Sequence, residues 1–455
     1  MTAVIRPGSG LTASLARTLH AAVDGELDAE AVRGAESLLL HALRVSITGR
    51  DLPGASLAWE TVSDNTGVCT VIGRPTGVSG PDAAFANAVA GHSSLKEDCG
   101  PGGLREGSHP GTYVIPAALA AAEMSGAGGR SLLRGIIMGY DTVSRLGAAS
   151  PAGIGRRRFR PVGVMAPFGA AGAAAGVWSL DPAAISSAIA VSANMAAGVN
   201  QGIFEGTMEP YFHSGIGARN GLLAAQLAKA GAVTATHSLE GEWGFFETYG
   251  GEPGSSDLLT EERAYHAVTK LGTKRFAACL QNQETVALIV DTAPSALEAC
   301  DIVHVTVRRP SSGRNGLESP GVSREPPFST MLQAQMSARF TAAAGLCRAP
   351  VESAAFFRDS FDDPVITAVA AKIDLVPSTD GSVSVEIETA DRRIVLDSDV
   401  SGTVFPDCAE ICSRFLSDVG AQVGGEAAEA VLDLVQRLKD DIPVAYLTRA
   451  LALRK

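Results

Sequence analysis

The hydrophobic positions of residues 1–268 recur mostly with the spacing of α-helices. The segments GAESLLLHALRVSITG (residues 34–49) and AAQLAKAGAV (residues 224–233) place apolar side chains three or four positions apart, and several such segments end in Gly. In SLDPAAISSAIAVSANMAAG, Asp181 stands directly before Pro182, which is typical of a helix start. The pattern therefore predicts a mainly helical structure for this part of the chain.

The pattern changes near Leu271. DIVHVTVRRP (residues 301–310) alternates apolar and polar side chains like a β-strand, and GSVSVEIETADRRIVLDSDVSG (residues 381–402) predicts a β-hairpin. Between them, STMLQAQMSARFTAAAGLC (residues 329–347) and DPVITAVAAKIDLV (residues 363–376) predict helices. This part of the chain is therefore expected to mix helices and strands.

The helical pattern returns from Cys408 onward, in AEICSRFLSDVG and GEAAEAVLDLVQRLKDD. We expect this tail to rejoin the first domain. The predicted fold is thus a mainly α-helical domain of residues 1–268 and 408–455, with an inserted α+β domain of residues 269–407. The junction of two such domains is a common place for a small-molecule site.

Composition narrows the possible functions. Hydrophobic residues make up 46% of the 455 residues and charged residues 19%, which is sufficient for a large core. The net charge of −12 argues against a nucleic-acid partner. The sequence shows no signal peptide and no membrane-spanning apolar run, so we predict a cytoplasmic protein without a membrane partner. The cysteines are scattered and no metal-ligand spacing occurs, so no metal ion is expected.

Small residues dominate two of the predicted helices, residues 168–176 and residues 183–198. Such residues allow helices to approach closely. We expect both segments to be buried at or beneath the contact of a homodimer.

Histidines and cations stand out in segments rich in Gly and Pro. The loop GHSSLKEDCGPGGLREGSHPGT (residues 91–112) lies between two apolar helices, so it must hydrogen-bond its own backbone or bind a ligand. It contains His109, while Arg160 lies in GRRRFRPVG, His213 in YFHSGIGARNG and Lys274 in GTKRFAAC. Taken singly, each of these residues has a structural explanation, as a solvated cation, a helix cap or a buried histidine. Together they predict a cationic pocket for a carboxylate between the domains.

Several segments, in order along the chain, resemble motifs of the MmgE/PrpD family, which includes 2-methylcitrate dehydratase, cis-aconitate decarboxylase and iminodisuccinate epimerase. They are AAFANAVAGH, HPGTYVIPAALAAAE, LLRGIIMGYDTVSRLG, PFGAAGAAAGVWSLD, GTMEPYFHSGIGARNGLLAAQLAKAG, LEGEWGFFETYG and TKRFAAC. The resemblance implies a helical domain with an inserted α/β lid and a site in the groove between them. It also implies a dimer that works without metal or organic cofactor.

The resemblance assigns roles to individual residues. His109 matches the active-site histidine of the family's H-P-[GS] segment, and Lys274 matches the lysine of its lid. Tyr140 and His213 also stand at family positions. Arg160 stands where relatives have a pocket histidine, and Pro210 lies near the family's second lysine.

The loop before His109 departs from the family pattern. Relatives read H-A-x-D-F-D-D-T where this chain reads HSSLKEDC. Leu95 replaces the first Asp, Glu97 keeps an acid, Asp98 is retained and Cys99 replaces Thr. These differences predict a substrate unlike the family's usual ones, and the composition suits one of secondary metabolism.

The resemblance favours dehydration of a β-hydroxy (poly)carboxylate, which needs a base, an acid and cations for the growing negative charge. The candidate catalytic residues are His109, Lys274, Asp98 and Tyr140. The candidate substrate-binding residues are Arg160, His213, Arg275, Glu97 and Cys99. Two other hypotheses stay open: a decarboxylase or epimerase acting on a related carboxylate, and a catalytically silent dimeric binding protein.

Overall fold

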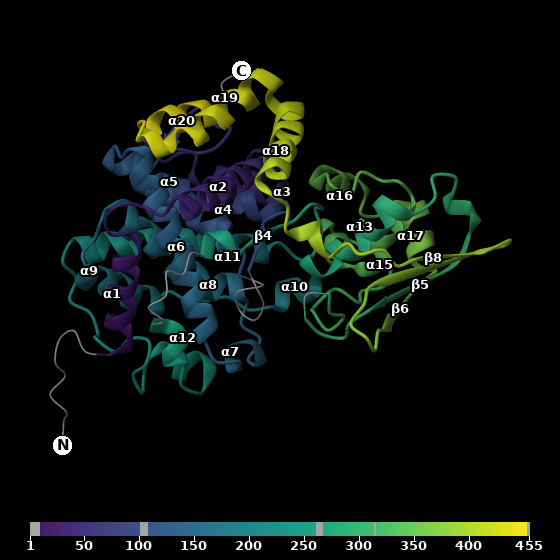
Figure 1. Ribbon diagram of the computed structural model, residues 1–455, viewed down its shortest axis with the longest axis horizontal. Coiled ribbons are helices and arrows are strands. Elements are labelled where there is room, and N and C mark those ends of the chain that lie inside the picture. Colours follow the sequence, from purple (N-terminus) through teal and green to yellow (C-terminus); the bar gives the residue numbers. More distant parts are fainter. Residues whose placement is uncertain (1–9, 101–107, 261–266, 314, 453–455) are drawn as a thin grey trace.

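The computed structural model describes residues 10–100, 108–260, 267–313 and 315–452 (Figure 1), and two large hydrophobic clusters form most of its core. The larger cluster draws its buried residues from positions 15–268 and 411–451. The smaller cluster draws all of them except Leu52 from positions 276–396. We call the regions around these clusters the helical part and the sheet-containing part. The exact division into domains at 268/269 and 407/408 stays a prediction.

Helices build nearly all of the helical part. They are α1 (Leu11–Val23), α2 (Ala29–Gly49), α3 (Pro53–Val62), α4 (Gly80–Ser93), α5 (Gly111–Ser125), α6 (Gly129–Ala149), α7 (Gly153–Arg156), α8 (Pro161–Val177), α9 (Pro182–Ala193), α10 (Gln201–Glu205), α11 (Glu209–Lys229), α12 (Ser256–Thr260), α18 (Cys408–Val423), α19 (Gly425–Gln436) and α20 (Val444–Leu451). Short helical turns are η2 (Phe246–Gly250), η3 (Ala267–Thr269) and η7 (Leu438–Asp440), and short strands are β1 (Cys69–Thr70), β2 (Gly77–Val78) and β3 (Asp98–Cys99).

Local sequence explains where many of these helices begin. Asp28, Ser79, Asp181 and Asp407 precede α2, α4, α9 and α18, and each side chain accepts hydrogen bonds from free backbone N–H groups of the first turn. The helix start predicted at Asp181 is therefore confirmed. Such caps fix where each helix enters the core.

Helix α8 lies at the centre of the helical part, packed against α6 and α11. A Cβ atom on Gly172 would lie 2.3 Å from Thr142 Oγ1 of α6, so only glycine allows this approach. Gly221 of α11 is equally restricted, because a Cβ atom there would lie 2.2 Å from the Pro167 carbonyl oxygen. The burial of residues 168–176 thus arises within one chain, and the homodimer stays a prediction.

The C-terminal helices pack on the helical part. Helix α18 contacts α2 and α20 contacts α5, and Figure 1 shows α18–α20 in yellow beside these purple and blue helices. The tail therefore lies beside helices that it follows by several hundred residues.

Within the described ranges, no helix is both long enough and apolar enough to cross a bilayer.

A four-stranded sheet organises the sheet-containing part, in the order β6-β5-β7-β8. Its elements are β4 (Gly272–Thr273), η4 (Leu280–Asn282), α13 (Gln283–Thr292), η5 (Ala299–Asp301), β5 (Ile302–Arg309), α14 (Met331–Met336), α15 (Ala338–Leu346), α16 (Ala354–Ser360), α17 (Pro364–Ala370), β6 (Ile373–Pro377), β7 (Ser384–Thr389), β8 (Arg393–Leu396) and η6 (Ser401–Val404). Helices α13 and α15 pack on the sheet, and α17 packs on α15.

The structure confirms the strand predicted at residues 301–310 and the hairpin predicted at 381–402, which is β7 paired with β8. The helix predicted over 363–376 is wrong in its second half. Helix α17 ends at Ala370, and β6 follows as a parallel neighbour of β5, with Ile373 opposite Val305. A short apolar run has no clear periodicity, so pairing with β5 decides its structure.

Candidate active site

A two-stranded pairing joins the loop after α4 to the start of the sheet-containing part. In it, β3 runs antiparallel to β4, with Asp98 opposite Thr273 and Cys99 opposite Gly272. The backbone N–H of Lys274 also donates to the carbonyl oxygen of Glu97 at 3.3 Å. Residues far apart in the sequence are thereby held side by side.

A buried ion cluster forms at this pairing. The Lys274 Nζ atom lies 3.2 Å from Glu97 Oε2 and donates to the Leu95 carbonyl oxygen at 3.2 Å. The His92 Nδ1 atom lies 2.8 Å from the other carboxylate oxygen, Glu97 Oε1. These side chains are at most 2% exposed. We call His92, Glu97 and Lys274 the front cluster.

Burial and charge set the protonation of these groups. Burial favours a raised pKa for Glu97, but the positive charge of Lys274 outweighs burial and holds the pKa well below its usual range. Burial lowers the pKa of His92, and burial together with Lys274 lowers the pKa of His109 well below its usual range. At neutral pH, Glu97 is therefore ionised and both imidazoles are neutral.

His109 is held in a defined orientation just before α5. Its Nδ1 atom lies 2.6 Å from the backbone carbonyl oxygen of Asp98. A carbonyl oxygen only accepts hydrogen bonds, so Nδ1 carries the proton and Nε2 carries the lone pair. The backbone at His109 is left-handed, with φ of 49°, a costly conformation that surrounding contacts must maintain.

Asp98 provides those contacts. Its carboxylate accepts the Gly111 N–H at 3.0 Å and the Tyr140 hydroxyl at 2.8 Å, while its own carbonyl accepts from the His109 ring. Burial raises the pKa of Asp98 to about 7 and the pKa of Tyr140 well above its usual range. Neither residue lines the cavity described next. Both hold His109 in place, rather than standing where a ligand would.

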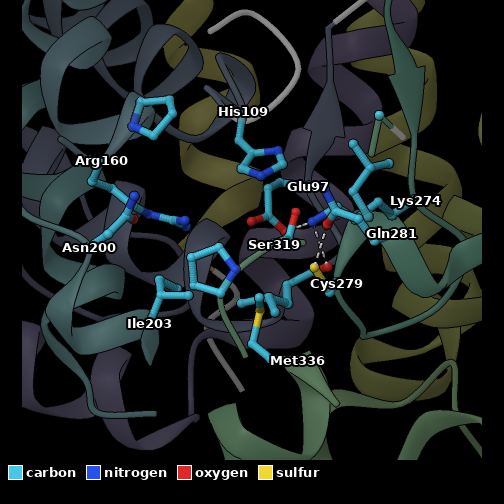
Figure 2. A pocket seen from close by; sticks show the side chains of 15 residues that line it. Glu97, His109, Arg160, Asn200, Ile203, Lys274, Cys279, Gln281, Ser319 and Met336 are labelled. Carbon is cyan, nitrogen blue, oxygen red and sulfur yellow. Dashed lines mark hydrogen bonds and ion pairs between the residues drawn. The ribbon is translucent and has the colours of Figure 1, made fainter. Parts of the chain in front are cut away.

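A cavity of about 430 Å³ lies between the two parts, beside the front cluster (Figure 2). This volume is in the range of small-molecule sites. The lining residues are Leu95, Glu97, His109, Arg160, Pro161, Asn200, Ile203, Lys274, Cys279, Leu280, Gln281, Gly313, Ser319, Pro320 and Met336. Four predicted site residues, Glu97, His109, Arg160 and Lys274, are among them.

Arg160 is the N-terminal neighbour of α8 and reaches the cavity from the side opposite Lys274 (Figure 2). Among the described residues, its guanidinium group has no carboxylate partner within ion-pair distance, and its Nε atom is buried without a hydrogen-bond acceptor. Burial lowers its pKa, and the negative charge of Glu97 opposes this. An arginine in this state is well suited to hold a carboxylate through two parallel hydrogen bonds.

Three other predicted substrate-binding residues do not line the cavity. Arg275 forms ion pairs with Asp291 and Glu352 at 2.9 and 2.7 Å. For His213, burial and the nearby charge of Arg160 lower the pKa to about 4. Cys99 is buried against Leu280 and Val404.

Sequence reasoning missed several lining residues, among them Asn200, Cys279, Gln281, Ser319 and Met336. Cys279 was the easiest to find, because it ends the TKRFAAC segment that contains Lys274. Its thiol donates to Gln281 Oε1 at 2.7 Å, and burial raises its pKa. The other residues lie in or next to irregular segments with no recognisable motif.

The described residues include no group of three or more His, Cys, Asp or Glu side chains arranged to hold a metal ion. The site that the structure does present combines a neutral imidazole, an ion pair and an unpaired guanidinium group around one cavity. Such a set supplies proton transfer and anion binding from the side chains themselves.

The fold and this cavity define a mainly helical protein with buried acid–base side chains where it meets a small mixed α/β part. The model of the MmgE/PrpD N-terminal domain matches residues 13–256, more than half of the chain. The chain therefore belongs to the MmgE/PrpD family, which includes lyases such as 2-methylcitrate dehydratase. No curated protein matches the chain.

Proposed function

We propose that this protein is a lyase that removes water from a β-hydroxy carboxylate, with the reaction in the cavity between the two parts. One observation carries the proposal: the imidazole of His109, neutral and with its Nε2 lone pair available, shares the cavity with Lys274 and with an unpaired Arg160. Dehydration needs a base, an acid and an anion-binding group, and these three side chains supply them.

In the proposed reaction, His109 is the base. Its Nε2 atom takes the proton from the carbon next to the substrate carboxylate. The electron pair of that C–H bond forms the carbon–carbon double bond as the bond from the β-carbon to the hydroxyl oxygen breaks. The hydrogen bond from Nδ1 to the Asp98 carbonyl keeps the ring orientation and stabilises the imidazolium that forms.

Lys274 is the proposed acid. Two of its ammonium protons are directed to Leu95 and Glu97, which leaves a third for the departing hydroxyl group. The hydroxyl leaves as water, and transfer of the proton from His109 to Lys274 restores both groups. Arg160 holds the carboxylate, on which negative charge builds as the proton leaves.

The test is turnover and hydrogen exchange with a panel of β-hydroxy carboxylates in deuterated water. We expect His109→Gln and Lys274→Met to lower the rate of alkene formation by about 10²–10⁴-fold, as for removal of a general acid or base. Circular dichroism checks that both variants fold. Arg160→Gln is expected to raise KM and also to lower kcat, because it removes both carboxylate binding and the stabilisation of the growing negative charge.

Other outcomes would overturn the proposal in identifiable ways. Exchange at the α-carbon with inversion and no alkene would identify an epimerase, and release of carbon dioxide would identify a decarboxylase. Binding without any turnover would identify a binding protein. If both variants kept wild-type turnover, His109 and Lys274 would not perform the chemistry.

A further inference from the structure

The cavity has two chemically different sides. Arg160, Asn200 and His109 face it from one direction and Lys274 with Gln281 from another, whereas Ile203 and Met336 lie on its lower side in Figure 2. Leu95, Ile203 and Met336 belong to one hydrophobic cluster and are 4%, 2% and 6% exposed. We call these three apolar lining residues the apolar wall.

The charges on the polar side limit how many carboxylates it holds. Among the described lining residues, the cations are Arg160 and Lys274 and the anion is Glu97. Lys274 and Glu97 form an ion pair at 3.2 Å, so their charges largely cancel. The charge of Arg160 is left for one ligand carboxylate. Among the described lining residues, no further cation is available to a second carboxylate, and burial of that carboxylate beside Glu97 without one is strongly unfavourable.

The neutral polar groups of the lining fit the rest of a hydroxy acid. Asn200, Gln281 and Ser319 carry amide and hydroxyl groups, which hydrogen-bond a substrate hydroxyl without requiring charge. The apolar wall has no polar atom to offer, so a carbon substituent is the group that it accommodates best.

We infer that the substrate carries a single carboxylate, bound by Arg160, and an apolar substituent that packs on Leu95, Ile203 and Met336. This inference rests on the proposed function for the reaction, and it specifies the substrate class: a β-hydroxy monocarboxylate with an alkyl or aryl group, rather than a di- or tricarboxylate.

Binding of unreactive acids tests the inference without turnover. Titration calorimetry with acetate, butanoate and hexanoate should show affinity rising about fourfold for each methylene that the wall buries. Succinate and citrate should bind at least about tenfold more weakly than hexanoate. Citrate binding tighter than hexanoate, or affinity independent of chain length, would overturn the inference.

Variants of Met336 locate the effect in the apolar wall. Met336→Ala should weaken hexanoate binding by roughly tenfold or more and leave acetate unchanged, because only the longer chain reaches the wall. Met336→Lys should reverse the preference, so that succinate binds better than hexanoate. Met208→Lys is the matched control, since Met208 is 40% exposed and lies outside the cavity lining. Equal effects of the Met336 and Met208 variants would contradict the assignment.

The two proposals fail separately. If the acids bind as expected but no hydroxy acid loses water, the proposed dehydration is wrong and the inferred substrate class is kept. If a tricarboxylate is dehydrated efficiently and binds tighter than hexanoate, the reaction stands and the substrate class is wrong. Melting curves of the Met336 variants show whether they fold, and acetate binding reports an intact Arg160 site.

Discussion

Two neighbouring residues, Lys96 and Glu97, take part in buried ion clusters on opposite sides of the same loop. Glu97 belongs to the front cluster with His92 and Lys274. Lys96 faces away from it, with its Nζ atom 2.7 Å from Asp418 Oδ2 of helix α18. The Arg44 Nε atom of α2 lies 2.8 Å from the same oxygen. We call Arg44, Lys96 and Asp418 the back cluster.

Both clusters hold a carboxylate and a buried lysine whose neighbours are charged, but they differ in access to a ligand. Burial lowers the pKa of Lys96 to about 8, and the two cations hold the pKa of Asp418 below its usual range despite burial. None of the back-cluster residues lines the cavity, whereas Glu97 and Lys274 both do. Perturbed protonation alone therefore does not identify a reactive site. The back cluster ties α18 to the loop, and the front cluster faces the space where a substrate fits.

The largest expected difference between the clusters is in turnover. Glu97→Gln removes the counter-charge of Lys274 and disturbs the proposed acid, so kcat should fall by about 10²-fold or more. Asp418→Asn should change kcat by less than about threefold, because no back-cluster group contacts the cavity. Steady-state kinetics of the two folded variants measures both effects. Similar losses in the two variants would remove the distinction between the clusters.

The next effect is on stability. Asp418→Asn removes the ion-pair partner of the buried Arg44 and Lys96, which should lower the free energy of unfolding by about 3 kcal/mol. Asp433→Asn is the matched control, because Asp433 of α19 forms an exposed ion pair with Arg437, the residue directly after the helix. It should change stability by less than about 0.5 kcal/mol. Urea unfolding measures both variants, and an equal loss would show that the back cluster is not a structural anchor.

Stability should also depend on pH in opposite ways for Asp98 and Asp418. The pKa of Asp98 is raised to about 7, above its unfolded value of about 3.9, so its contribution is present below about pH 4 and lost as the pH rises to about 7. The pKa of Asp418 is lowered, so its contribution is present at neutral pH and lost as the pH falls below about 4.

Urea unfolding from about pH 4 to about pH 7 tests whether the contribution of Asp98 to stability falls as the pH rises. Asp98→Asn stays neutral, so the variant should lose less stability than the wild type as the pH rises through this range. Asp141, whose pKa is also raised to about 7, keeps its own contribution in both proteins and cancels in the comparison. A steeper loss in the variant would contradict the raised pKa of Asp98.

The sequence was sufficient to predict most helices and part of the candidate site. Helices α2 and α9 carry a repeated spacing and, at α9, a clear cap, so local signals determine them. His109 and Lys274 belong to recognisable motifs, and the structure brings both to the cavity. The second half of segment 363–376 had no equivalent signal, because pairing with β5 decides its structure.

Contacts between distant segments explain what remained unpredictable in the site. Arg275 follows Lys274 directly, yet its side chain pairs with Asp291 and Glu352 and does not line the cavity. Asn200 and Ser319 reach the same cavity from different parts of the fold. No periodicity or motif in either segment reports that proximity.

The smallest predicted effect is that of the hydrogen bond from Tyr140 to Asp98, the residue that holds His109 in place. Tyr140→Phe removes the 2.8 Å hydrogen bond to Asp98 and should lower the free energy of unfolding by about 1 kcal/mol. That hydrogen bond lowers the pKa of Asp98. Its loss should therefore raise the pH at which the contribution of Asp98 to stability is lost. Turnover should fall by less than about tenfold, since His109 keeps its bond to the Asp98 carbonyl. Tyr446→Phe, at an exposed position, controls for loss of a hydroxyl group. A 10²-fold or larger loss of kcat in Tyr140→Phe, with unchanged stability, would instead place the Tyr140 hydroxyl among the groups that act on the substrate.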